Sequence, residues 1–383
     1  MKEKDALESI REAIENLDQT IVNALGERQK IVQKVISDKL QSSREIRDPD
    51  REEAVLNRIR TLAKESGMDP FFIEQLFREI IHHSVRYQTH VLLDTQNDKA
   101  ADTKISVAFQ GTDGAFSHMA ALRHFEHRYD QVECIGFTTF RQAAEAVENN
   151  DVDVALLPIE NTTAGSINDT YDLLGEKHLY IAGEEVLRII HCLMAPEPVK
   201  IENIRRILSH PQAIAQCSKF LYKLPRCHVE SYFDTAMAAR KVRDDADLSQ
   251  AAIASSYAAE LYGLHIIKRD IINQEENFTR FVVVSRDELI CDPQITCKTS
   301  LMFTTSHDKG ALLNCLNVIG DHGINMAKIE SRPRPNHPWQ YLFYLDVEGN
   351  LQEPAVDAAI KKLRTKAQNL KVFGSYPAKQ GEW

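Results

Sequence analysis

An arginine interrupts the apolar seam of a long predicted helix near the N-terminus. Apolar residues recur there at alternating spacings of three and four residues, which is typical of a helix that packs along one stripe. Arg28 stands where the next apolar residue is due. Because a guanidinium group in such a seam is costly unless it meets an anion, Arg28 predicts an anionic ligand. The seam residues are Leu7, Ile10, Ile14, Leu17, Ile21, Ala24, Ile31 and Val35.

Two further cations on the same helix stand in different relations to Arg28. Lys39 follows Arg28 by 11 residues, so on a straight helix the two side chains point within about 20° of each other, about 16 Å apart along the axis. They can converge on a ligand between them. Arg11 precedes Lys39 by 28 residues, or about 42 Å along the axis. No small molecule spans that distance, so a functional Arg11 must complete a site on a second chain, in an intertwined dimer.

Two more predicted helices offer matching polar groups. Asp48, Arg51 and Glu52 share one helical face by their spacing. Ser84 and Gln88 continue the apolar stripe of the third helix, where polar groups usually need a partner. Taken singly, each has a structural explanation: a helix cap, a solvated charge, or a hydroxyl bonded to its own helix. The combination predicts a binding site in an all-helical unit.

These residues resemble, in type and spacing, the active site of the all-helical chorismate mutases, and the resemblance covers residues 1–93. It implies that the ligand is chorismate, which is rearranged to prephenate. A pericyclic step needs only a compact ligand conformer and stabilisation of the charge that grows on the ether oxygen. By this resemblance Arg28, the partner's Arg11 and Arg51 would bind carboxylates, while Lys39 and Gln88 would donate to the ether oxygen. The full set is Arg11, Arg28, Lys39, Asp48, Arg51, Glu52, Ser84 and Gln88.

Polar strings also fall at the ends of predicted strands in the middle of the chain, the usual place for ligand groups in α/β sheets. The string PIENTTAGSIND occupies residues 158–169, and NFTRF at residues 277–281 opens the last strand. Ser209 follows another strand, with Gln216 one turn into the next helix. Residues 111–117 form a turn onto a helix N-terminus that suits an anion. Taken singly, such strings are usual turn chemistry.

Together these strings resemble prephenate dehydratase over about residues 104–288. The reaction so implied removes carbon dioxide and the ring hydroxyl from prephenate, driven by the gain of aromaticity. The resemblance implies Thr279 as the catalytic residue; because its hydroxyl is a weak acid, we expect it to donate within a polar network. Thr112 and Ala115 depart from the family pattern, where proline and a hydroxyl residue are common. The residues expected to line the prephenate site are Glu160, Asn161, Thr162, Ser209 and Gln216.

The last segment, residues 297–378, has a predicted βαββαβ order, the ferredoxin-like arrangement. It resembles an ACT regulatory domain, which binds amino acids between subunits. The helix start favours a carboxylate, and Glu330 could meet an ammonium group. The alternative is an oligomerisation unit that binds no ligand. The residues that resemble phenylalanine-binding motifs are Gly310, Ala311, Leu312, Glu330, Ser331 and Arg332.

The elements that must position these residues fall into three segments. Residues 1–93 read as three helices, the first ending near Lys39, and residues 94–103 as a polar linker. Strand and helix patterns alternate over residues 104–288, which predicts an α/β domain with a largely parallel sheet, and the resemblance implies a fold of the periplasmic-binding type. Residues 297–378 complete the chain as an α+β domain.

Composition narrows the function further. The formal net charge of the 383 residues is −10, which argues against binding to nucleic acid or to an acidic membrane surface. The charged N-terminus lacks the apolar core of a signal peptide, and no apolar run approaches a membrane span. The seven cysteines form no Cys-x-x-Cys pair and read as reduced thiols of a cytoplasmic protein. We expect neither a metal nor a cofactor.

These observations favour a bifunctional enzyme that converts chorismate to prephenate and then to phenylpyruvate, as a homodimer or higher homo-oligomer inhibited by L-phenylalanine. A rival from another class is an amino-acid-sensing binding protein with a vestigial helical dimerisation domain. The complete helical set and Thr279 argue against it, because a sensor needs neither. A second rival pairs the mutase with prephenate dehydrogenase. The chain contains no Gly-x-Gly-x-x-Gly for a dinucleotide fold, which argues against that rival.

Overall fold

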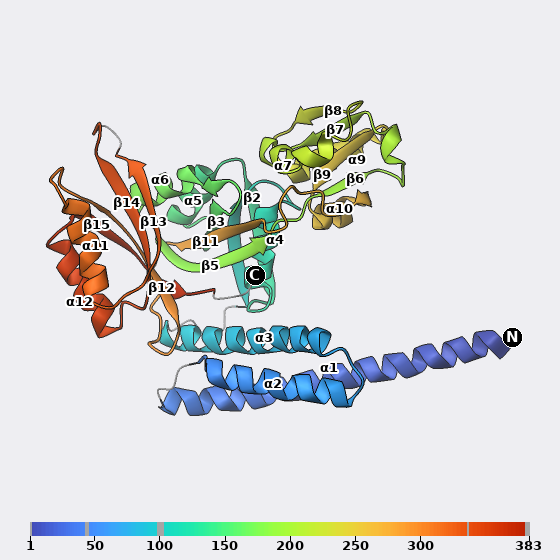
Figure 1. The fold of residues 1–383 in the computed structure, drawn as a ribbon, viewed down its shortest axis with the longest axis horizontal. Coiled ribbons are helices and arrows are strands. Elements are labelled where there is room, and N and C mark those ends of the chain that lie inside the picture. The colour runs from blue at the N-terminus through green and yellow to red at the C-terminus, as the bar shows by residue number, and fades with distance from the viewer. Residues whose placement is uncertain (1, 43–45, 98–102, 335–336, 380–383) are drawn as a thin grey trace. The chain divides into compact units, whose positions relative to one another are not determined.

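The computed structural model describes residues 2–42, 46–97, 103–334 and 337–379 (Figure 1); of residues 2–7 and 35–42 it describes only the backbone. The chain divides into two compact units. One comprises residues 1–100 with 292–296, and the other comprises residues 101–291 with 297–383. Within the described ranges, no helix combines the length and the apolar character that crossing a membrane requires.

The first unit consists of three helices, and the second and third begin at the Asp-Pro pairs Asp48-Pro49 and Asp69-Pro70. They are α1 (Lys2–Ser42), α2 (Pro49–Glu65) and α3 (Pro70–Gln96). Asp48 and Asp69 cap α2 and α3 by accepting hydrogen bonds from backbone N–H groups, as expected of aspartate before a first-turn proline. Helix α3 runs past the predicted linker start at residue 94, because Leu92 and Leu93 are buried and Asn97 caps the helix end. The linker prediction is wrong at this end.

The apolar seam of α1 lies on the surface of the single chain. Ile14, Leu17 and Ile21 expose 52%, 64% and 57% of their surface. Apolar side chains exposed in a continuous stripe usually mark a contact surface. The core of this unit instead lies between α2 and α3, where Leu56, Ile59 and their neighbours are buried.

The first lobe of the second unit is a mixed sheet in the order β2-β1-β3-β11-β5, with the short β4 paired to β3. Strand β11 runs antiparallel to both of its neighbours. The prediction of a largely parallel sheet is therefore wrong here, because β11 brings the chain back into the sheet in the opposite direction. The strands are β1 (Lys104–Gln110), β2 (Gln131–Phe137), β3 (Val154–Asn161), β4 (Gly165–Ser166), β5 (Tyr180–Arg188) and β11 (Phe278–Ser285); the helices are α4 (Phe116–Phe125), α5 (Phe140–Glu148) and α6 (Asn168–Glu176).

The second lobe is a sheet in the order β10-β6-β9-β7-β8. The chain enters it between β5 and β6 and returns between β10 and β11, so two segments connect the lobes (Figure 1). Such a two-lobed arrangement is what the predicted likeness to periplasmic-binding-type folds implies. The strands are β6 (Cys192–Ala195), β7 (Arg206–Ser209), β8 (His228–Ser231), β9 (Gln250–Ala254) and β10 (His265–Lys268); the helices are η1 (Ile201–Asn203), α7 (Pro211–Gln216), α8 (Ser218–Leu221), α9 (Thr235–Asp245) and α10 (Ser256–Tyr262).

The C-terminal domain has the predicted βαββαβ order, with a sheet in the order β13-β14-β12-β15. Alternate residues of this sheet serve two cores. Leu301 and Leu345 pack with α11 and α12, whereas Met302 and Tyr344 join the core of the first lobe. The domain is therefore fused to that lobe rather than tethered to it. Its elements are β12 (Cys297–Thr304), α11 (Ala311–Asp321), β13 (Met326–Pro333), β14 (Tyr341–Glu348), α12 (Pro354–Arg364) and β15 (Gln368–Pro377).

Candidate active sites

In the helical unit, Arg28 on α1 meets the polar end of the stripe on α3. Its Nη1 donates a hydrogen bond to the Ser84 hydroxyl oxygen at 2.5 Å. Ser84 itself donates to the carbonyl oxygen of Ile80 at 2.8 Å, and Gln88 Nε2 donates to the carbonyl oxygen of Ser84 at 3.2 Å. Gln88 is buried, and its Oε1 has no hydrogen-bond partner among the described residues. Three predicted mutase residues thus lie together between two helices.

The surroundings of Arg28 favour a bound anion. Partial burial lowers the pKa of its guanidinium group below the ordinary value. No carboxylate in the described part of the chain forms an ion pair with it, and the Ser84 hydroxyl is a neutral partner. A cation that has lost water without gaining a counter-charge is stabilised by an anionic ligand.

Three other predicted mutase residues lie at the start of α2. The Asp48 carboxylate accepts a hydrogen bond from the backbone N–H of Arg51 at 3.0 Å, and both residues are exposed. Glu52 forms an ion pair with Arg47 at 3.3 Å. No hydrogen bond or ion pair among the described residues joins these side chains directly to Arg28.

Arg11, near the start of α1, does not join the cluster at Arg28. Arg11 is exposed and lies 17 residues before Arg28 on one unbroken helix, which is about 26 Å along the axis. Within one chain it cannot reach a ligand held by Arg28. The side chain of Lys39 lies outside the described residues.

The second site centres on Asn161 at the end of β3, whose carboxamide is fixed from both sides. Its Oδ1 accepts hydrogen bonds from the backbone N–H groups of Thr163 at 3.0 Å and Ala164 at 2.8 Å. Its Nδ2 therefore faces β11, where it donates to Thr279 Oγ1 at 2.9 Å and to the carbonyl oxygen of Phe278 at 3.1 Å. Because Thr279 Oγ1 accepts this hydrogen bond, its own hydrogen remains available to a ligand.

A directed chain of hydrogen bonds reaches Asn161 from the second lobe. His191 Nε2 lies 2.9 Å from Gln216 Oε1, Gln216 Nε2 donates to Thr163 Oγ1 at 2.7 Å, and Thr163 Oγ1 donates to Asn161 Oδ1 at 2.7 Å. His191 must therefore carry its hydrogen on Nε2. Burial lowers the pKa of the His191 imidazole, which favours the neutral ring. Hydrogen bonds that point the same way polarise one another, so the chain strengthens donation toward Thr279.

An open pocket of about 170 Å³ lies between the lobes beside this chain of hydrogen bonds. Thr163 and Asn277 contribute to it from the first lobe, and α7 contributes from the second lobe. None of the side chains that line this pocket is charged, and most are carboxamides. Thr279 is not among the residues that line the pocket and is 8% exposed. The lining residues are Thr163, Gln212, Ala215, Gln216, Ile272, Asn273, Gln274 and Asn277.

Three remaining predicted residues of this site have structural partners. The buried Ser209 hydroxyl donates to the carbonyl oxygen of Ile253 at 2.6 Å. Thr162 Oγ1 accepts from the backbone N–H of Phe278 at 2.9 Å, and so ties β11 to the turn after β3. Glu160 was expected to line the same site as Asn161, but the structure does not place it there. Successive residues of a strand point to opposite faces. Glu160 lies opposite to Asn161 and does not face the Thr279 cluster.

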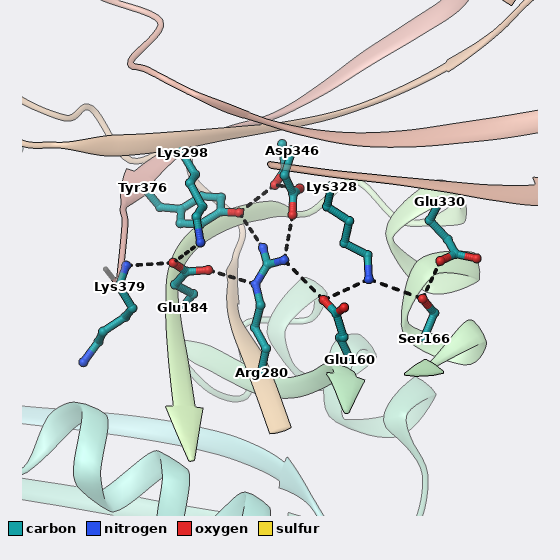
Figure 2. A network of polar contacts seen from close by, with 11 residues as sticks. Glu160, Ser166, Glu184, Arg280, Lys298, Lys328, Glu330, Asp346, Tyr376 and Lys379 are labelled. Atoms are coloured by element: carbon teal, nitrogen blue, oxygen red, sulfur yellow. Dashed lines mark hydrogen bonds and ion pairs between the residues drawn. The ribbon is translucent and has the colours of Figure 1, made fainter. Parts of the chain in front are cut away.

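Glu160 belongs to a network between the first lobe and the C-terminal domain (Figure 2). Lys328 Nζ lies 2.8 Å from Glu160 Oε2. Arg280, the neighbour of Thr279 on β11, forms ion pairs with Glu184 at 2.8 Å and Asp346 at 2.7 Å. Each strand thus gives one face to the Thr279 cluster and the other to this network.

The predicted phenylalanine strings lie on different sides of the C-terminal sheet. Gly310 adopts φ +79° directly before α11, and Ala311 and Leu312 begin the helix. On the opposite face, Glu330 accepts a hydrogen bond from the Ser166 hydroxyl and Arg332 forms an ion pair with Asp172 at 2.8 Å. The Glu330 carboxylate therefore already accepts one hydrogen bond, which an ammonium group would have to share or replace. Ser331 is exposed.

The prediction missed three residues that the structure places in the second site, namely Thr163, His191 and Asn277. Thr163 and Asn277 lie within the polar strings, so the strings located them without distinguishing them from turn residues. His191 stands alone in the apolar run Ile189–Met194. A single polar residue in such a run needs a buried partner, and this was the available signal.

Comparison with known proteins finds two families in this chain. The family model for chorismate mutase type II matches residues 10–89, and that for prephenate dehydratase matches residues 107–289. A bifunctional chorismate mutase/prephenate dehydratase from Enterobacter agglomerans is 38% identical over 379 residues, which cover 99% of this chain and 97% of that protein.

Two solved structures resemble the second unit. A prephenate dehydratase from Arthrobacter aurescens in complex with L-Phe is 29% identical, with a TM-score of 0.65, over 72% of this chain and 90% of that one. A protein named GqqA, described as a novel type of quorum quenching acylase, is 33% identical, with a TM-score of 0.65, over 72% of this chain and 98% of that one. Since the similarity to the Enterobacter protein spans both sites and nearly the whole of each chain, this chain belongs to the bifunctional chorismate mutase/prephenate dehydratase family.

Proposed function

We propose that this chain rearranges chorismate to prephenate in its helical unit and converts prephenate to phenylpyruvate in its two-lobed unit. In the first reaction Arg28 would bind a carboxylate of chorismate, since its guanidinium group is partly buried without an acidic partner. Gln88 would donate to the ether oxygen through its amide hydrogens. Asp48, Arg51, Glu52 and Ser84 would complete the ligand's surroundings, with Lys39 at the far end of α1.

The mutase site would be completed by a second copy of the chain. The exposed seam of α1 supports this, since residues such as Leu17 leave a long apolar stripe without a partner in one chain. Arg11 lies on the same helix and is too far from Arg28 to share its ligand. In an intertwined dimer the seam would be buried and the partner's Arg11 would reach the ligand.

In the second reaction Thr279 would donate its hydroxyl hydrogen to the departing ring hydroxyl of prephenate. The observation that carries this role is the hydrogen bond from Asn161 Nδ2 to Thr279 Oγ1 at 2.9 Å, which leaves the threonine hydrogen free. The ring would enter from the pocket between the lobes, with its hydroxyl toward Thr279. The electron pair of the bond that releases carbon dioxide then enters the ring. All the electrons of the reaction come from prephenate itself, so this step requires no metal or cofactor.

The test of both activities is direct. Purified full-length protein is incubated with chorismate, and then separately with prephenate, while prephenate and phenylpyruvate are measured. We expect chorismate to be consumed, prephenate to appear transiently, and phenylpyruvate to accumulate. Failure to make phenylpyruvate from prephenate would refute the dehydratase assignment, whereas failure to consume chorismate would refute only the mutase assignment.

We further propose that L-phenylalanine binds the C-terminal domain and inhibits the dehydratase through the hairpin formed by β3, β4 and their turn. Glu160 and Ser166 are cross-strand partners in this hairpin. Lys328 contacts both, at 2.8 Å from Glu160 Oε2 and 3.3 Å from Ser166 Oγ (Figure 2). Asn161 ends β3 and Thr163 lies in the turn, so both stand between these two partners along the chain. A shift of β13 would therefore displace the residues that orient Thr279.

The effector's ammonium group would have to compete with Ser166 for Glu330, which supplies a reason for such a shift. Equilibrium dialysis with L-phenylalanine tests the binding, and a dehydratase assay with added L-phenylalanine tests the inhibition. A protein that does not bind L-phenylalanine would refute the whole regulatory proposal.

A variant separates binding from its transmission. Lys328→Met should weaken inhibition while L-phenylalanine still binds. The matched control is Lys361→Met, which removes an exposed lysine paired with Asp357 on α12 of the same domain. Unchanged inhibition in Lys328→Met would refute the hairpin as the route.

A further inference from the structure

The pocket between the lobes contains a buried hydrogen-bond donor that has no partner. Asn277, directly before β11, is 1% exposed and lines the pocket, yet its Nδ2 meets no acceptor among the described residues. A buried amide donor left unpaired costs free energy comparable to a lost hydrogen bond. Such an atom beside a pocket points to a ligand that supplies the missing acceptor.

The orientation of this amide follows from its neighbours. Asn161 Nδ2 must carry hydrogens, because Asn161 Oδ1 already accepts from two backbone N–H groups. Asn277 therefore presents its oxygen to Asn161, at 2.8 Å from Nδ2. Its own NH2 group then has to point away from Asn161. The hydrogen-bond network thus imposes the unpaired donor.

Asn277 and Thr279 lie on the same side of the chain, since both accept a hydrogen bond from Asn161 Nδ2. Two residues of extended chain span roughly 6.6 Å. The two groups that leave prephenate, the ring carboxylate and the ring hydroxyl, stand at opposite corners of one six-membered ring. Side chains of two residues at this backbone spacing can therefore address two groups on opposite corners of such a ring.

We propose that Asn277 Nδ2 donates a hydrogen bond to the ring carboxylate of prephenate, the carboxylate that is lost, while Thr279 addresses the ring hydroxyl. This inference rests on the proposed dehydratase function and adds a substrate-binding residue to it. The carbon–carbon bond to the ring carboxylate breaks and its electron pair enters the ring. The carbon–oxygen bond to the hydroxyl breaks with its electron pair going to oxygen, which leaves as hydroxide while it accepts a hydrogen bond from Thr279.

A neutral amide suits a carboxylate that must depart. The ring carboxylate loses its negative charge as it becomes carbon dioxide, so a cation would stabilise the starting state more than the transition state. The pocket offers carboxamides and no charged side chain in its lining. An amide can orient the carboxylate without holding its charge in place.

The variant Asn277→Asp isolates the donor. Aspartate keeps an oxygen for Asn161 and replaces only the NH2 group, so the position of Asn161 is preserved. We expect kcat/KM for prephenate to fall by about 10- to 100-fold, mainly through KM. Inhibition by the product phenylpyruvate should be unchanged, because phenylpyruvate lacks the ring carboxylate but keeps the side-chain carboxylate.

Three controls make the result decisive. Asn149→Asp introduces the same charge at an exposed helix end of the same lobe and should leave both constants unchanged. Chorismate mutase activity and the thermal midpoint report whether the variant is folded. If Asn277→Asp does not fold, the neutral variant Asn277→Ser should show the same selective loss.

The inference fails on either of two outcomes. An unchanged KM for prephenate would show that the donor does not bind the substrate. Equal weakening of prephenate and phenylpyruvate would place Asn277 at the side-chain carboxylate instead. Neither outcome touches the dehydratase assignment, which stands or falls on whether the wild-type protein makes phenylpyruvate.

Discussion

Under the proposed functions, the two candidate sites bind dicarboxylates by opposite means. The helical unit offers a partly buried arginine, Arg28, with further cations on the same helix. The two-lobed unit offers a pocket lined by Asn and Gln side chains, with its cations on the far side of the sheet. The difference follows the chemistry, because chorismate keeps both carboxylates through the rearrangement, whereas prephenate loses one. In this proposal, a cation holds a carboxylate that stays on the substrate, and neutral hydrogen-bond donors orient the carboxylate that leaves.

The largest effect that tests this contrast is expected from Arg28→Ala. Loss of the guanidinium group removes the charge that holds a carboxylate in the reactive conformer. Mutase kcat/KM should fall on the order of 10³-fold, while dehydratase activity stays within about twofold of wild type, as the two compact units predict. Steady-state assays with each substrate provide the measurement. Near-normal mutase turnover would sink the assignment of Arg28.

The converse change is Thr279→Val, which keeps the shape of the side chain and removes its hydroxyl. Dehydratase kcat should fall on the order of 10²-fold, the usual contribution of a positioned acid. Mutase activity should be spared. Loss of both activities would indicate misfolding, and the thermal midpoint of the variant would reveal it.

Adding a cation to the neutral pocket is a further test of the contrast between the cationic site and the neutral site. Gln212 is exposed and lines the pocket, so Gln212→Lys adds a positive charge there. We expect a lower KM for prephenate with a kcat lower by about tenfold, because the charge would stabilise the ground state. Gln212→Met, of similar length and neutral, is the control. A cation that raised kcat would contradict the argument for neutral donors.

The smallest expected effect is a change in the thermal stability of the protein in acid. Burial lowers the pKa of His191 below its ordinary value, so the unfolded chain binds the proton more readily. The stability from this group is complete above the unfolded value near 6.5 and is lost as pH falls below it. His191→Gln, which keeps a donor toward Gln216, should reduce the fall in thermal midpoint between pH 7 and 5.5 by about 2 °C.

His118, His124 and His210 have pKa values lowered by burial in the same way. They should therefore continue to destabilise the His191→Gln variant in acid. An unaltered pH profile in that variant would show that His191 is protonated in the folded protein.

Neighbouring residues in the polar strings lie on opposite faces of the sheet. Asn161 and Thr279 meet on one face of the first-lobe sheet, whereas Glu160 and Arg280 meet the C-terminal domain on the other. The string that contains Glu160 and Asn161 located the site, yet it could not assign each residue to a face. That assignment depends on where β11 enters the sheet and on what packs against each side.

Sequence alone determined the features that depend on nearby residues. The Asp-Pro starts of α2 and α3, the interrupted seam of α1, and the βαββαβ order all follow from local capping and periodicity. The family resemblance located Arg28, Ser84, Asn161 and Thr279, which contact one another in pairs in the structure.

Only the tertiary structure decided what depends on distant partners. It turned Glu160 and Glu330 toward the interface between the first lobe and the C-terminal domain, and it linked His191 through Gln216 to the cluster at Thr279. It also left the NH2 group of Asn277 buried without an acceptor. Hydrogen-bond satisfaction is a property of assembled neighbours, and these neighbours lie far apart along the chain.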